Sequence, residues 1–148
     1  MTIITIAQYG LLLIFSLFLA FHFLVLLKVI PYSIVWGGHL KSDREMYRFE
    51  IISILMNSIF FVLILIQSGI LTYEFPQRIM TIMLWFMSGL FLLNTIGNLM
   101  SKNRMEKIFF TPVTIILTVL TFLLALYNWQ ELNGNSLWEY FIVNVICK

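Results

Sequence analysis

Eight polar side chains stand in apolar parts of the chain and are its best candidates for chemistry. The first is His22, which could hydrogen-bond a neighbouring helix, carry a proton, or bind a metal or haem iron. The others are one carboxylate, three hydroxyls and three amides: Glu50, Ser53, Asn57, Asn94, Asn98, Thr111 and Thr114. Such groups are costly within hydrocarbon unless they find partners or water, so their positions indicate where a site would form.

The spacing of these residues is helical. Glu50, Ser53 and Asn57 follow one another at three and four residues, and Asn94 and Asn98 are four apart. This spacing places each set on one face of a helix. If the faces point inward, they line one shared polar vestibule. The alternative is that these side chains form hydrogen bonds between packed helices. This is the favoured interpretation for the threonines and for His22.

The composition requires that these faces belong to membrane helices. The chain has 148 residues, of which 61% are hydrophobic and 11% charged. A soluble protein of this length cannot bury so much apolar surface, so soluble enzyme classes are excluded. The net charge of +2 is small and dispersed, which excludes nucleic acid as a partner. Cys147 is the single cysteine, so no disulfide forms within the chain, and we predict no metal and no cofactor.

Apolar segments long enough to cross a bilayer predict an all-α membrane protein, an antiparallel bundle of four transmembrane helices in a single domain, 1–148. Pro31 is expected to end the first span, and Pro112 is tolerated in the first turn of the last. The tail, 128–148, divides into a polar turn and a short interfacial C-terminal segment that begins near Trp138. The four spans are expected at about 3–30, 51–70, 79–100 and 108–127.

Basic residues predict the orientation of this bundle. Two connections on the same side of the bundle hold seven of the nine basic residues: Lys28, Lys41, Arg44, Arg48, Lys102, Arg104 and Lys107. Positive loops stay in the cytoplasm, so loops 1 and 3 are predicted to be cytoplasmic and both termini to face outward. The proposed vestibule then opens toward the cytoplasm.

The first of these connections is the least generic stretch of the chain. It holds aromatic, glycine and closely spaced charged residues that could form a lid or a docking surface: Trp36, Gly37, Gly38, His39, Lys41, Asp43, Arg44 and Arg48. The alternative is a well-made helix start, in which Ser42 or Asp43 is the cap and Glu45 completes a capping box. In the same interpretation Glu50 sits at the membrane interface and pairs with Arg48 or Lys28.

Several strings in the chain resemble those of a group of small, uncharacterised four-span bacterial membrane proteins. The resemblance covers most of the chain except the tail, and it implies a bacterial cytoplasmic membrane but no activity. The strings are Pro31-Tyr32 with Trp36-Gly37-Gly38, Leu40-Lys41-Ser42-Asp43, Met46-Tyr47-Arg48-Phe49-Glu50, Leu93-Asn94-Thr95-Ile96-Gly97-Asn98, and Glu106-Lys107-Ile108-Phe109-Phe110-Thr111-Pro112.

Three classes of function follow from these features. The first is an accessory or binding subunit, favoured because the strongest signals concern packing. The second is a small oligomeric channel or transporter whose polar vestibule faces the cytoplasm. The third is a membrane enzyme or haem protein that uses His22 with Glu50. The lipid bilayer is the expected surrounding, and small residues on several spans are compatible with a homo-oligomer or another membrane protein as partner.

Overall fold

A computed structural model describes residues 2–32, 42–104 and 106–134. Four long helices make up nearly all of this part of the chain, and each is long and apolar enough to cross a membrane. A helix of 24 residues is about 36 Å long, which exceeds the roughly 30 Å of hydrocarbon in a bilayer. The helices are α1 (Ile3–Leu26), α2 (Asp43–Gln67), α3 (Gln77–Met100) and α4 (Thr111–Asn133), the last preceded by a π-helical turn, η3 (Glu106–Phe110).

Two ends differ from the expected spans 3–30 and 51–70. α1 ends at Leu26, before Pro31 can act, because Lys28 takes a left-handed conformation with φ of 60°. α2 begins at Asp43 rather than near residue 51, because the Ser42 hydroxyl accepts a hydrogen bond from the backbone N–H of Glu45 at 3.3 Å. Ser42 is thus the helix cap, and Asp43 stands in the first turn. The helix start expected at Ser42 or Asp43 is confirmed, and α2 begins eight residues before the expected span, 51–70.

α3 starts at Gln77 and ends at Met100, close to the expected 79–100. The last helix departs more from its expected span, 108–127. α4 continues to Asn133 and ends at Gly134, whose φ of 63° closes the helix in a left-handed cap. The first part of the expected polar turn is therefore helical. The predicted interfacial segment from Trp138 onward lies outside the described residues.

The start of α4 contains a wide turn. The backbone of Glu106–Phe110 is π-helical, and Pro112 follows directly in the first turn of α4. Proline has no N–H to continue the hydrogen-bond ladder, and an extra residue in a turn is a common local solution. Here the Thr111 hydroxyl donates to the Glu106 carbonyl at 3.2 Å and bridges the irregular step. The π turn matters because it holds Glu106 against the bundle.

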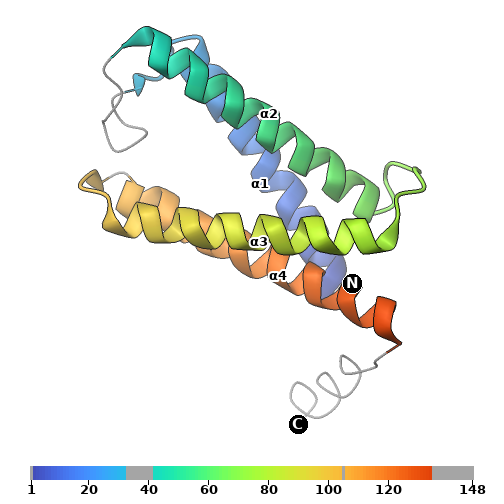
Figure 1. Cartoon of the computed structure of the whole chain (residues 1–148). Helices are drawn as coiled ribbons and strands as arrows, with labels where there is room; N and C mark the ends of the chain where they lie inside the picture. The colour runs from blue at the N-terminus through green and yellow to red at the C-terminus, as the bar shows by residue number, and fades with distance from the viewer. Residues whose placement is uncertain (1, 33–41, 105, 135–148) are drawn as a thin grey trace.

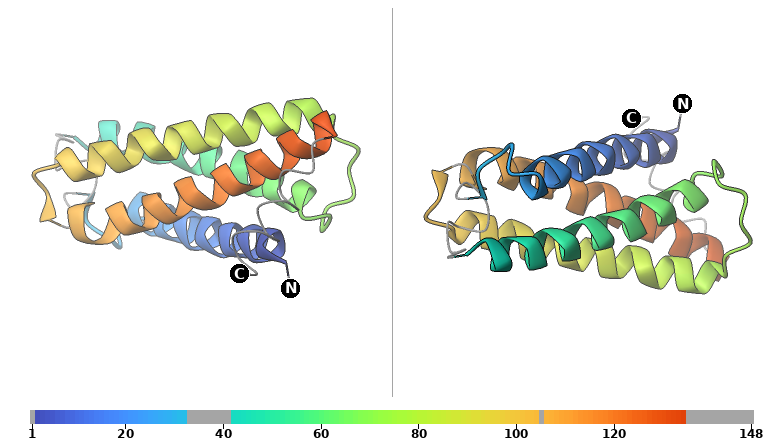
Figure 2. Two further views of the ribbon diagram at one scale, coloured as in Figure 1. Left: turned by 90° about the horizontal axis from the view of Figure 1, so that it is seen from below. Right: turned by 90° about the horizontal axis from the view of Figure 1, so that it is seen from above.

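The helices form two hairpins, α1 with α2 and α3 with α4 (Figure 1). Within each hairpin the contacts are extensive, and α1 also packs on α4, whereas α2 and α3 barely touch. A close approach joins the hairpins at Gly10, where a methyl group would lie 3.3 Å from Cδ1 of Leu120. The pairs cross and separate toward the end that holds the α3–α4 connection, as Figure 1 shows, and Figure 2 shows the same bundle from below and from above. This separation creates the space described below.

The centre of the bundle is an aromatic cluster. Phe15 of α1, Phe60 of α2 and Phe91 of α3 are buried, and their ring centroids lie 5.8 to 6.1 Å apart. Aromatic rings at this separation attract one another beyond the effect of burial alone. The cluster therefore connects the two hairpins between the weakly contacting helices α2 and α3.

Side-chain amides join the helices at the end where α1 begins. Asn128 is fully buried, and its amide exchanges two hydrogen bonds of 3.1 Å with Gln67. Gln77 donates to the Asn128 carbonyl oxygen at 3.2 Å and to Glu131 at 3.1 Å. Gln8 donates to the Gln67 backbone carbonyl at 2.9 Å. This amide clamp thus contains residues of all four helices.

The clamp makes a prediction for stability. Replacing Asn128 by Ala removes three side-chain hydrogen bonds, and we expect the free energy of unfolding to fall by about 1–2 kcal/mol, as for polar contacts between membrane helices. Asn133→Ala is the matched control, because the Asn133 amide donates only within its own helix, to the Trp129 carbonyl. Unfolding in mixed micelles with increasing dodecyl sulfate measures both. Equal losses of stability for the two variants would show that Asn128 does not join the helices.

Candidate functional site

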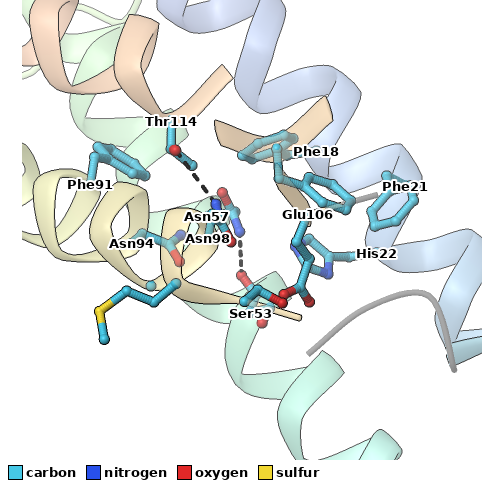
Figure 3. Close-up of a pocket in the computed structure, with 14 residues that line it drawn as sticks. Phe18, Phe21, His22, Ser53, Asn57, Phe91, Asn94, Asn98, Glu106 and Thr114 are labelled. Carbon is cyan, nitrogen blue, oxygen red and sulfur yellow. Dashed lines mark hydrogen bonds between the residues drawn. The ribbon is translucent and has the colours of Figure 1, made fainter. Parts of the chain in front are cut away.

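A cavity of about 470 Å³ lies at the end of the bundle where the hairpins separate (Figure 3). It receives polar side chains from all four helices and from the π turn. Six of the eight polar residues singled out from the sequence line it: His22, Ser53, Asn57, Asn94, Asn98 and Thr114. The fold therefore brings together residues that are far apart in the sequence. His22 and Thr114, for example, are separated by 92 positions. That the cavity is functional stays a prediction.

Glu50 does not line the cavity but stands directly behind His22. Its carboxylate is fully buried, and Oε2 lies 2.7 Å from Nδ1 of His22. A carboxylate at Nδ1 orients an imidazole and favours the tautomer whose Nε2 is the free acceptor. His22 keeps 17% of its side chain exposed and contacts the cavity. Glu50 was expected to pair with Arg48 or Lys28 at the interface; its ion pair is with His22, and Lys28 pairs with Asp43.

Glu106 belongs to the site and was not among the residues predicted for it. Its side chain is 7% exposed and lines the cavity, and Figure 3 shows it pointing into the same part of the cavity as His22. The π turn carries it there. A signal was present in the sequence, because Glu106, Phe110 and Thr114 are four residues apart and all line the cavity. Extending the threonine face back by two turns would have reached Glu106.

The three asparagines contribute differently. Asn57 donates to the backbone carbonyl of Ser53 at 2.8 Å, within its own helix. Asn98 reaches across to α4 and lies 3.5 Å from the Thr114 hydroxyl. Asn94 is exposed and lines the cavity wall. The Asn57 and Asn98 amides are therefore held in place while still contacting the cavity, which is the arrangement expected of groups that position a ligand.

The threonine hydroxyls of α4 donate within their own helical segment, and Thr114 also accepts a hydrogen bond from Asn98 of α3 at 3.5 Å, so their role as contacts between helices stays a prediction. Thr111, Thr114 and Thr118 each donate to a carbonyl of the helical chain that carries them, at 2.8 to 3.2 Å. Such bonds satisfy the hydroxyl locally. Thr111 is buried and does not line the cavity, so it supports the π turn rather than the vestibule.

Aromatic rings form the remaining walls. Phe18 and Phe21 of α1 flank His22, with ring centroids 6.4 and 5.7 Å from the imidazole. Phe110 packs edge-to-face on Phe21 at 5.6 Å, and Phe91 closes the inner end as part of the central cluster. The cavity thus combines apolar walls with a few convergent polar groups, the usual makeup of a small-molecule site.

Part of the predicted connection site is described. Asp43 bonds Lys28 at 2.5 Å, and this hydrogen bond raises the pKa of Lys28 above its ordinary value. The pair links the end of α1 to the start of α2, where each charge is favourable for its helix dipole. Arg44 and Arg48 are exposed on the first turns of α2. The other five predicted residues lie outside the described ranges: Trp36, Gly37, Gly38, His39 and Lys41.

No family model, no curated protein and no solved structure matches the chain. The resemblance to small four-span bacterial proteins therefore stays a prediction. Among residues 2–32, 42–104 and 106–134, no three histidine, cysteine or acidic side chains are grouped so that they could hold a metal ion. The chemistry of the site thus rests on hydrogen bonding, on charge and on one histidine–carboxylate pair.

The buried pair can be measured by a double-mutant cycle. His22→Leu removes a charge-assisted hydrogen bond from buried Glu50, and we expect a loss of about 1.5–3 kcal/mol in the free energy of unfolding. Glu50→Leu should cost a similar amount. The double variant should lose clearly less free energy of unfolding than the sum of the two single losses, because no buried polar group is then left without its partner. Additive losses in dodecyl sulfate titrations would show that the two side chains are not coupled.

Proposed function

We propose that this chain is a multi-pass protein of a bacterial inner membrane, in which it acts as a binding or accessory subunit that takes up a small solute between its two hairpins. The outer faces of the helices support the membrane location. Large apolar side chains there are about half exposed or more, for example Leu13 at 62%, Leu55 at 58% and Leu93 at 66%. Such a surface is suited to lipid and not to water.

The observation that carries the binding function is the cavity itself. It gathers an imidazole, a carboxylate and amides at one end of the bundle. Ionisable groups within membrane helices are costly and are kept mostly at functional sites. Basic residues cluster at the same end of the bundle, so the positive-inside rule favours a cavity that opens to the cytoplasm and termini that face outward. The solute would then enter from the cytoplasm.

Water access to the cavity tests this proposal. We expect Ser53→Cys and Asn98→Cys, each in a Cys147→Ser background, to react with the impermeant reagent MTSET added to inside-out membrane vesicles. Thr121→Cys is the matched control, because Thr121 is fully buried in α4 away from the cavity. The cavity positions should react at least tenfold faster than this control. If neither reacts, the cavity is closed packing and the binding proposal is wrong.

A second cavity favours transport as the alternative function. It has a volume of about 930 Å³ and lies at the opposite end of the bundle, beside the amide clamp. Its lining includes Gln8, Glu74 and Glu131. The cluster of Phe15, Phe60 and Phe91 lies between the two cavities. On each of the helices α1, α2 and α3, the phenylalanine stands between or beside the residues that line the two cavities. Polar cavities on either side of an apolar constriction are an arrangement used by channels and transporters.

The constriction can be opened by one substitution. We expect Phe60→Ala to raise the efflux of tetramethylammonium from proteoliposomes several-fold over that of the unsubstituted chain, because it removes one ring of the cluster. Phe86→Ala is the matched control, since Phe86 is 50% exposed on the outer face of α3. Both variants are first checked for monodispersity, because loss of a core Phe costs about 3–5 kcal/mol. Equal efflux from all three proteins would rule out this transport path and leave the binding proposal unaffected.

A further inference from the structure

Carboxylates are the acidic groups that the described residues bring to the cavity. Of the fourteen described residues that line it, Glu106 is acidic and none is Lys or Arg. A second carboxylate, Glu50, is joined to the cavity through His22 at 2.7 Å. Both carboxylates are shielded from solvent, with exposures of 0% and 7%. A charge acts more strongly where water is excluded, so these groups favour a positively charged ligand and oppose an anion.

The aromatic walls of the cavity indicate which class of cation it would bind. Phe18 and Phe21 flank His22, Phe110 packs on Phe21, and Phe91 stands at the inner end of the cavity. A cation held within about 6 Å of such rings is attracted by their negative faces, most clearly when it is an alkylated ammonium group. A bare metal ion would instead require several oxygen ligands close together. The described residues offer no group of three histidine, cysteine or acidic side chains that could hold a metal ion, and a volume near 470 Å³ is far larger than an ion.

We propose that this cavity binds an organic ammonium ion with an apolar substituent, its charge facing Glu106 and the His22–Glu50 pair and its apolar part lying among the phenylalanine rings. The inference rests on the proposed binding function and names the ligand class of the same site. The amides of Asn57 and Asn98 lie in the same wall. They can accept hydrogen bonds from a ligand with N–H groups.

Protection of a cavity cysteine tests the ligand class. The full chain with Asn98→Cys and Cys147→Ser, in phosphatidylcholine proteoliposomes, is labelled by MTSET in the presence of one of three probes. Benzyltrimethylammonium carries the proposed charge, benzyl alcohol is neutral, and benzenesulfonate is an anion. We expect millimolar benzyltrimethylammonium to slow labelling at least fivefold and the other two probes to slow it less than twofold.

The charged partner is tested in the same assay. Adding Glu106→Gln keeps the shape of the side chain and should raise the concentration of benzyltrimethylammonium needed for protection by about tenfold. Glu74→Gln is the matched control, because Glu74 lies beside the other cavity and should change nothing. The rate of labelling without a probe shows whether each variant keeps the cavity intact.

The outcomes separate the two proposals. If the cysteine labels rapidly but benzyl alcohol or benzenesulfonate protects as well as the ammonium ion, the cavity is a binding site of another class and the cation inference is overturned. The same holds if no probe protects it. If the cysteine does not label even without a probe, the binding function itself fails. Charge-selective protection that weakens with Glu106→Gln and not with Glu74→Gln supports both.

Discussion

Every polar side chain placed inside this apolar bundle has to find a hydrogen-bond partner, and the two ends of the bundle meet that requirement in opposite ways. At one end Gln67, Gln77 and Asn128 satisfy one another and hold the helices together. At the other end the hairpins separate. Some of the polar side chains there bind a partner in the protein, and others face the cavity. Glu50 is paired with His22, whose ring is left facing a cavity. The amide clamp joins all four helices at one end, and the hairpins separate at the other.

Much of this arrangement could be predicted because it follows from local rules. Length and hydropathy gave four helices, and helical periodicity placed His22, Asn57 and Asn98 on faces that meet at one cavity. The capping pattern also predicted the helix start at Ser42, which lies before the apolar span expected at 51–70. Hydropathy reports transfer to lipid and not backbone geometry, so it misses a polar first turn.

The features that escaped prediction depend on contacts between distant segments. Asn128 was assigned to a turn after the last span, yet its partners in α2 and α3 allow it to be buried within a helix. Glu106 lies just before the last expected span, 108–127, and was not among the predicted site residues. Its burial requires the π turn before Pro112 and the cavity wall formed by the other hairpin. No local pattern encodes these partners.

Charged residues at the end that holds the His22 cavity form an exposed basic layer and a buried acidic layer. The two layers act differently on a charged ligand. The exposed basic residues Arg44, Arg48 and Lys102 stand at the ends of helices, whereas the carboxylates of Glu50 and Glu106 are buried among them. Surface charges are screened by salt over about 8 Å, so the outer layer acts weakly on a solute that approaches through water. The buried layer acts at lower dielectric and close range, where a unit charge is worth several times more. The proposed preference for a cation therefore depends on the buried carboxylates and not on the basic surroundings, whose stronger effect is on how the bundle lies in a membrane.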